Sequence, residues 1–220
     1  MLKAIVFDVD YTLAKPGPDL GPEGYRRLGE RHGLVLDPER YDEARRAAIT
    51  DLERHPELDH DEEIWIRFTE RIIRGMGGSG TATYAAAVEM EGAWSHAHHF
   101  ELYDDAISTL ASLRLRGLKL GLLSNSARDL DAFVEHHGLR VDAVLTSRTH
   151  GKTKPHQGIF LRMLELLAVQ ADEAMMVGDT PDDDVEGALA VGMRAVLVDR
   201  DGRFPERESL PDLRAVAALI

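Results

Sequence analysis

The feature that most limits how this chain folds is a short apolar run that ends in two acidic residues. Residues 4–7 are all apolar, and Asp8 and Asp10 follow with one residue between them. A continuous apolar run of this length is typical of a strand buried on both faces, as in parallel sheets covered by helices. Ligand sites in such folds lie beyond the carboxyl ends of the strands, so we expect a site at these two aspartates.

Asp8 and Asp10 would place two carboxylates in one small volume, because side chains two apart on an extended backbone leave it on the same side. Their repulsion costs free energy unless a cation lies nearby. We expect Mg²⁺, a hard cation that prefers oxygen ligands. Two alternatives stay open: one carboxyl is protonated near neutral pH and acts as an acid, or the pair caps a strand-to-loop turn.

Strand and helix patterns alternate over the second half of the chain. Strands are expected at 118–123, 143–146, 174–177 and 195–198, and helices at 104–116, 127–137, 157–167 and 182–191. Strands joined repeatedly by helices require right-handed crossovers and therefore predict a parallel sheet. The expected fold class is α/β, with a Rossmann-like parallel sheet and helices on both of its faces.

A segment with helical periodicity alone interrupts this pattern after the first strand. Its start, residues 15–18, is rich in proline and glycine and cannot form a helix or a central strand. Helical patterns continue to about residue 99, with runs at 38–55, 61–76 and 81–95, and we expect no strand among them. We therefore predict an all-helical cap at residues 14–99, inserted into a catalytic core of residues 1–13 and 100–220.

Composition and charge exclude several classes of partner. The formal net charge of −13 argues against binding to a nucleic-acid backbone, which rests on clustered lysine and arginine. No apolar stretch approaches the length of a membrane span, and residues 1–3 have no signal-peptide architecture. Cysteine is absent, which excludes thiol catalysis and fits a reducing cytosol. We expect a cytoplasmic protein without nucleic-acid or membrane partners.

Two further strand ends carry polar residues suited to a phosphate group. Ser124 and Asn125 directly follow the second predicted strand, where a hydroxyl and the amides of the next helix suit a phosphate oxygen, although an ordinary helix cap explains them as well. Lys152 and Lys154 follow the third strand, and a lysine there can neutralise a carboxylate and a transferring phosphoryl group. Pro155 favours Lys154, because proline restricts the backbone of the residue before it.

The fourth expected strand is followed by an acidic run. Thr180, Pro181 and the next acids resemble an ordinary helix start, which accounts for Asp182 and Asp183. Asp179 needs another explanation, because it precedes the cap and directly follows a strand, as Asp8 does. Asp184 lies close enough in sequence to hold a metal-bound water or to orient Lys154.

Taken in order, these signals resemble the haloacid dehalogenase-like hydrolase superfamily. Its first motif is similar to Asp8 to Thr12, its second to Ser124 with Asn125, its third to Lys154-Pro155, and its fourth to Gly178-Asp179 with Asp184. The resemblance covers the whole chain, the helical cap included. Two departures stand out: Tyr11 replaces a common glycine, and His156-Gln157 replaces a common Asp-Pro pair.

The resemblance implies a magnesium-dependent phosphatase that acts through an aspartyl-phosphate. Asp8 would be the nucleophile, and Asp10 would protonate the leaving oxygen and then deprotonate water. Magnesium would be held by Asp8, Asp179 and the backbone carbonyl of Asp10, with Asp184 acting through water. Ser124, Asn125 and Lys154 would bind the phosphoryl group.

Within the family, Asp10 favours phosphoryl transfer, since the dehalogenases lack an acid at that position. Phosphonate cleavage would need a cap amine, and Lys15 is the one lysine between residues 14 and 99. A sugar-phosphate mutase, which shares the core residues, and a receiver-like phospho-acceptor protein remain as alternatives. Because a helical insert usually encloses a small molecule, the expected substrate is a small phosphomonoester.

Overall fold

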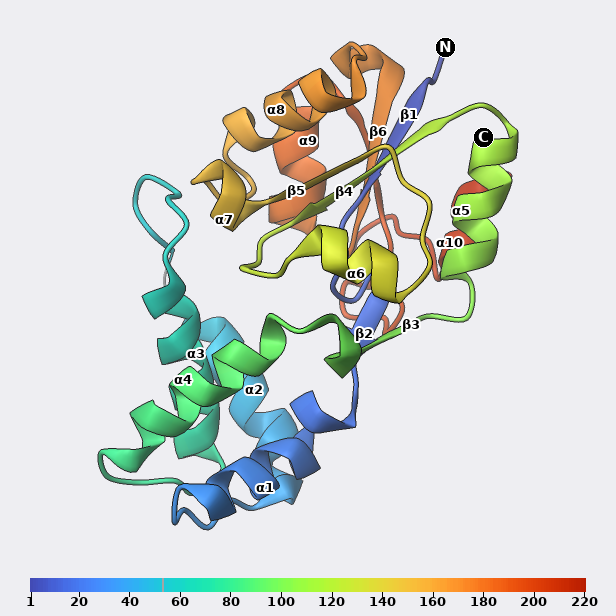
Figure 1. Ribbon diagram of the computed structural model, residues 1–220. Coiled ribbons are helices and arrows are strands. Elements are labelled where there is room, and N and C mark those ends of the chain that lie inside the picture. The colour runs from blue at the N-terminus through green and yellow to red at the C-terminus, as the bar shows by residue number, and fades with distance from the viewer. Residues whose placement is uncertain (53) are drawn as a thin grey trace. The chain divides into compact units, whose positions relative to one another are not determined.

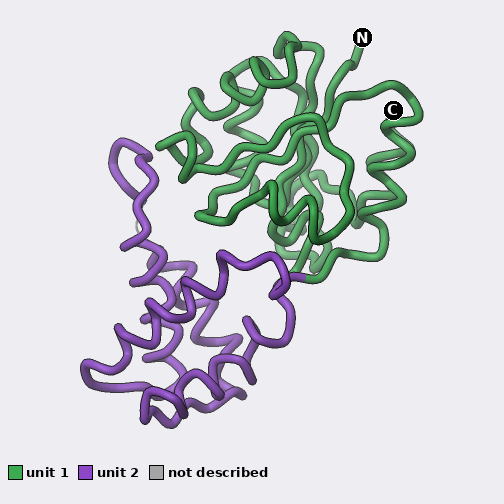
Figure 2. The backbone as a smooth tube through the Cα atoms, in the orientation of Figure 1, with its two compact units in different colours: residues 1–15, 101–220 green, residues 16–100 purple. Residues whose placement is uncertain are grey.

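The computed structural model describes residues 1–52 and 54–220, which form two compact units. One consists of Met1–Lys15 with Glu101–Ile220, and the other of Pro16–Phe100 (Figure 2). The predicted core and cap boundaries lie one or two residues from these. The predicted helical run at 38–55 includes residue 53, which lies outside the described residues.

The larger unit contains a five-stranded sheet in which every strand pair is parallel, in the order β5-β4-β1-β6-β7. The strands are β1 (Ala4–Phe7), β4 (Lys119–Ser124), β5 (Ala143–Thr146), β6 (Ala174–Gly178) and β7 (Arg194–Leu197). The predicted α/β fold class is confirmed. Because β1 lies between β4 and β6, the residues that follow these three strands emerge side by side.

Helices cover both faces of this sheet, with α8 and α9 on one side and α5 and α10 on the other (Figure 1). The helices of this unit are α5 (Ala106–Leu115), α6 (Leu130–His136), α7 (Ser147–His150), α8 (Gln157–Leu167), α9 (Gly187–Leu189) and α10 (Leu213–Ala218). Val6 packs into the same core cluster as Phe160 and Met163 of α8. Its neighbours Ile5 and Phe7 are also fully buried. The apolar run of β1 thus reflects burial on both faces.

The structure corrects the predictions at several short elements. Residues Ala14–Pro16 form strand β2, which pairs with β3 (Phe100–Leu102), so the expectation of no strand within residues 14–99 is wrong. A three-residue strand is too short to produce a recognisable alternation, and Pro16 is tolerated because this sheet has only two strands. The predicted helix at 182–191 is a π-helical turn, Pro181–Glu186, followed by the short α9. Helices α7 and α10 were not predicted.

Apart from short 3₁₀ turns and the ends of β2 and β3, the described residues of the smaller unit form four α-helices: α1 (Pro22–Arg31), α2 (Tyr41–Thr50), α3 (Glu62–Gly75) and α4 (Ala82–Trp94). Helix α3 packs against both α2 and α4. Gly75 permits the close approach of α2, because a Cβ at that position would lie 2.5 Å from the Cβ of Ala44. None of the helices in the described part of the chain is long and apolar enough to cross a membrane. The cytoplasmic location stays a prediction.

Candidate active site

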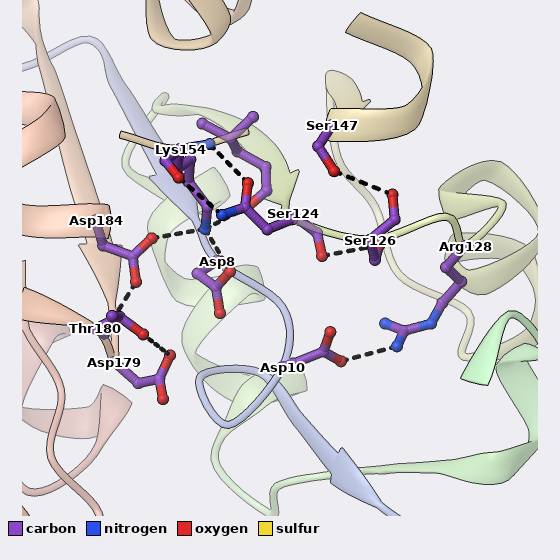
Figure 3. A network of polar contacts seen from close by, with 12 residues as sticks. Asp8, Asp10, Ser124, Ser126, Arg128, Ser147, Lys154, Asp179, Thr180 and Asp184 are labelled. Carbon is purple, nitrogen blue, oxygen red and sulfur yellow. Dashed lines mark hydrogen bonds and ion pairs between the residues drawn. The ribbon is translucent and has the colours of Figure 1, made fainter. Parts of the chain in front are cut away.

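The predicted site residues of the larger unit gather at the carboxyl edge of the sheet (Figure 3). Ser124 is the last residue of β4, Asp8 follows β1, and Asp179 follows β6. Lys154 comes from the segment between α7 and α8, and Asp184 from the π-helical turn. Residues that lie up to 176 positions apart in sequence therefore share one small region, as expected at the strand ends of an open α/β sheet.

Lys154 connects two of the aspartates. Its Nζ donates hydrogen bonds to Asp8 Oδ1 and to Asp184 Oδ1, both at 2.6 Å, and to the Leu123 carbonyl oxygen at 3.2 Å. The residue is only 3% exposed. An ammonium group has three N–H donors, and each here has an acceptor, so the position of the charge is fixed.

Burial and the neighbouring opposite charges have opposite effects on the pKa values of Lys154 and Asp8. Burial alone would lower the pKa of Lys154, but the adjacent carboxylates of Asp184 and Asp8 outweigh it and raise that pKa above the ordinary value. Burial raises the pKa of Asp8 well above its ordinary value, although Lys154 opposes the rise. Burial and then the charge of Asp184 raise the pKa of Asp179 to about 6. The cluster therefore holds more negative charge than its own cations neutralise.

Asp184 reaches the site from the π-helical turn. Its Oδ2 accepts a hydrogen bond from the Thr180 amide at 3.0 Å, while Oδ1 contacts Lys154. The carboxylate lies directly against Gly178, where a Cβ would come within 2.2 Å of Asp184 Cγ. The π-helical winding of residues Pro181–Glu186 brings this side chain inward, which is a common use of π turns at functional sites.

Asp179 is held by a residue that the sequence did not indicate. Arg203 Nη2 donates to Asp179 Oδ2 at 2.7 Å and to the Asp179 carbonyl oxygen at 3.0 Å. Asp199 supports the loop that carries this arginine, because its carboxylate accepts from the backbone amides of Arg203 and Phe204. No strand end or motif precedes Arg203, so only its tertiary position reveals the contact.

The three buried aspartates are suited to a divalent cation. Asp8, Asp179 and Asp184 each offer a carboxylate oxygen, and these oxygens lie within 4.8 Å of one another. An all-oxygen donor set is the one that Mg²⁺ and Ca²⁺ prefer. A bound cation would also oppose the raised pKa values of Asp8 and Asp179. The residues present therefore fit the predicted magnesium ion.

The carboxylate of Asp10 is not part of this group of three. Its Oδ1 lies 2.9 Å from Nη2 of Arg128, a buried arginine in the segment between β4 and α6. The predicted metal contact of Asp10 through its backbone carbonyl stays a prediction. The next residue, Tyr11, has φ of 63°, a left-handed conformation that explains why glycine suits this position.

The two residues of the second predicted motif, Ser124 and Asn125, make different contacts. Ser124 Oγ donates to Ser126 Oγ at 3.0 Å, and Ser124 is almost fully buried. The Asn125 amide instead makes two hydrogen bonds to the backbone of Lys154: Nδ2 donates to the carbonyl oxygen at 3.0 Å, and Oδ1 accepts from the amide at 2.7 Å. Binding of phosphate by Ser124 and Asn125 stays a prediction, but Asn125 clearly supports the Lys154 segment.

Comparison with known proteins agrees with this fold and site. The model of the haloacid dehalogenase-like hydrolases matches residues 2–192. The chain belongs to this family of hydrolases, as its four motifs predicted.

Two phosphatases and one solved structure are among the proteins to which the chain is similar. It is 38% identical over 154 residues to a phosphoserine phosphatase of Thermus thermophilus, a match that covers 67% of this chain and 61% of that protein. It is 31% identical over 219 residues to a ribulose-1,5-bisphosphate 5-phosphatase of Halopiger xanaduensis, covering 95% and 90%. The crystal structure of a HAD phosphatase from Thermococcus onnurineus superposes with a TM-score of 0.66 at 29% identity, covering 99% and 97%.

Proposed function

We propose that this hydrolase is a magnesium-dependent phosphatase that cleaves small phosphomonoesters through an aspartyl-phosphate on Asp8. The observation that carries the proposal is the Lys154 ammonium held between Asp8 and Asp184, 2.6 Å from each, beside Asp179. This places one fixed cation and three carboxylates where a phosphoryl group and a metal ion would both be bound. The names of the two relatives, both phosphatases, support the same reaction class.

Asp8 is the proposed nucleophile. Lys154 holds Oδ1 of its carboxylate, which leaves Oδ2 outside that contact and orients the group. Attack of a carboxylate oxygen on phosphorus breaks the bond to the leaving oxygen, and Asp10 gives its proton to that oxygen. Water then attacks phosphorus, Asp10 takes a proton from it, and the bond between phosphorus and Asp8 breaks. Phosphate is released and both carboxyl groups return to their starting states.

The remaining residues orient the phosphoryl group and balance its charge. Lys154 carries a fixed positive charge beside Asp8, and the buried Ser124 hydroxyl ends the adjacent strand. Asp8, Asp179 and Asp184 would hold Mg²⁺, which when bound would supply positive charge for the phosphoryl oxygens. Catalysis of this kind rests on positioning and electrostatics.

The helical unit Pro16–Phe100 is the proposed cap, and a small ester is the proposed substrate. The named substrates of the two relatives, phosphoserine and ribulose bisphosphate, are small molecules and support this size class. Asp10 favours phosphatase over dehalogenase chemistry, because a halide leaves without a proton.

The test measures phosphate release from p-nitrophenyl phosphate and a panel of sugar, amino-acid and nucleotide monophosphates, with and without Mg²⁺. We expect steady turnover that needs Mg²⁺, is abolished in Asp8→Asn and falls at least about a hundredfold in Asp184→Asn. Asp182→Asn is the matched control, because Asp182 lies in the same turn but is exposed. A single phosphorylation without turnover would favour the receiver-like alternative, and return of phosphate to a second sugar position would favour the mutase. Turnover of folded phosphoproteins alone would contradict the small substrate.

A further inference from the structure

Arg128 is a buried cation that the proposed reaction does not yet use. Its side chain is 1% exposed, although it lies only four residues beyond Ser124, in the segment that leads into α6. The guanidinium lies 5.4 Å from the ring centre of Phe133, on α6 itself. Burying an arginine costs free energy unless a charged partner compensates it, so its partner indicates what the residue does.

Asp10 is one charged partner of Arg128. Figure 3 shows the guanidinium aimed at the Asp10 carboxylate, and Nη2 lies 2.9 Å from Oδ1. The two side chains differ in access: Asp10 is 22% exposed, whereas Arg128 is almost completely enclosed. Arg128 therefore supports the carboxylate from the protein side, and Asp10 is the member of the pair that a substrate can reach.

The contact is a charge contact and not a directed hydrogen bond, because within the described residues Oδ1 of Asp10 accepts none. Attraction of this kind restrains the carboxylate without committing a lone pair of Oδ1 to a hydrogen bond. An acid and base group needs that combination, since its oxygens must stay available for the proton that it transfers.

Lys154, the buried cation that contacts Asp8, has no N–H group left to hold the Asp10 carboxylate. Its three N–H groups are committed to Asp8, Asp184 and the Leu123 carbonyl. Asp8 and Asp10 are two residues apart, yet each has a cation of its own from a different segment of the chain. The two carboxylates are thus held separately, one by Lys154 and the other by Arg128.

We propose that Arg128 is a positioning residue that holds the Asp10 carboxylate in place for proton transfer to the leaving oxygen. This inference rests on the proposed phosphatase function. It predicts that Arg128 matters most when the leaving group needs a proton. Phenol needs one more than p-nitrophenol does, because p-nitrophenol is the stronger acid.

The experiment compares kcat/KM for phenyl phosphate and p-nitrophenyl phosphate in Arg128→Met, Arg128→Lys and the wild type. We expect Arg128→Met to lose at least about tenfold on phenyl phosphate and less than about threefold on p-nitrophenyl phosphate. Arg128→Lys, which keeps the charge, should recover part of the loss. Arg140→Met is the matched control, since Arg140 is an exposed arginine beyond the other end of α6.

A double-mutant cycle with Asp10→Asn shows whether Arg128 acts through Asp10. We expect Arg128→Met to change kcat/KM for phenyl phosphate by less than about twofold when Asp10→Asn is already present. Equal losses on both esters, or effects of the two substitutions that multiply, would overturn the proposal. If Arg128→Met does not fold, as judged by circular dichroism, Arg128→Lys must show a smaller loss that is again greater on phenyl phosphate than on p-nitrophenyl phosphate. A wild type inactive on every ester refutes the phosphatase function instead.

Discussion

The side-chain amide of Asn125 bridges to the backbone of Lys154, with Nδ2 3.0 Å from its carbonyl oxygen and Oδ1 2.7 Å from its amide nitrogen. The two residues lie 29 positions apart, so this contact joins the end of β4 to the segment that carries the proposed catalytic lysine. The backbone of Lys154 is thereby fixed from one side, and its ammonium is fixed by Asp8 and Asp184 from the other.

Asn125→Ala should therefore damage activity through Lys154. It leaves the amide and carbonyl of Lys154 without their partner, a loss of about 1–3 kcal/mol in the free energy of unfolding. A displaced ammonium should lower kcat by roughly tenfold to a hundredfold. Urea unfolding and steady-state kinetics measure the two effects. Gln157→Ala, at an exposed amide that begins α8, should change neither, and unchanged kcat in Asn125→Ala would show that Lys154 needs no such support.

Gly178→Ala should displace Asp184. The new methyl group would lie 2.2 Å from Asp184 Cγ, so the carboxylate must leave its contact with Lys154. We expect a loss of about 1–3 kcal/mol in stability, together with weaker Mg²⁺ binding in calorimetry. Gly92→Ala is the control: no atom of another described residue packs within 4 Å of a Cβ there, and alanine in α4 should stabilise the fold by up to about 1 kcal/mol. Normal Mg²⁺ affinity in Gly178→Ala would argue against Asp184 as a member of the metal site.

Magnesium should stabilise the protein more at pH 7.5 than at pH 5. The pKa of Asp179 is raised to about 6 in the folded protein and returns to its ordinary value, near 3.8, on unfolding. The metal-free fold therefore binds the proton more tightly than the unfolded chain, and it loses stability as pH rises from about 4 to about 6. Above that range the carboxylate is ionised and ready for a cation.

Calorimetric Tm values with and without Mg²⁺ at the two pH values test this. At a hundredfold excess over Kd, a rise of roughly 5–10 °C is expected at pH 7.5, and a clearly smaller rise at pH 5. Asp179→Asn should remove most of the rise at both. An equal rise at pH 5 and pH 7.5 would mean that no carboxyl of the cluster titrates between them.

Tyr11 tests the turn that follows Asp10. Its φ of 63° is reached readily by glycine and only with strain by β-branched residues. Tyr11→Val should therefore be less stable than Tyr11→Gly by about 1–3 kcal/mol, although valine offers more side chain to pack. Chemical denaturation of both variants measures the difference. If valine is as stable as glycine, the backbone at this position does not keep the left-handed conformation in solution.

The order of strands and helices in the larger unit could be predicted because the buried positions of these elements are apolar at a regular spacing in the sequence. The run Ala4–Phe7 is buried on both faces, and its unbroken apolar character is the pattern that such burial leaves. The strand β2, of three residues, and the helices α7 and α10, of four and six residues, were missed because each is too short for the periodicity of its own type to repeat. The π-helical turn was predicted as an ordinary helix, because its proline and first-turn acids are those of an ordinary helix start, and its wider winding leaves no separate signal in the sequence.

Candidate site residues could be predicted where they follow a strand or match a motif, as Asp8 and Asp179 do. Arg128 and Arg203 could not, since neither stands at a strand end and arginine is common at surfaces. Their roles depend on what lies opposite them: Asp10 for Arg128 and Asp179 for Arg203.

The sequence alone therefore determined the sheet and the set of acids at the strand ends, because these follow from local periodicity and spacing, and it determined the family through the order of its four motifs. Tertiary structure alone decided which cation meets which carboxylate: Lys154 with Asp8 and Asp184, and Arg128 with Asp10. The physical reason is that a charge contact acts over a few ångströms, and Asp8 and Lys154, 146 residues apart, come within that range only when the sheet has formed.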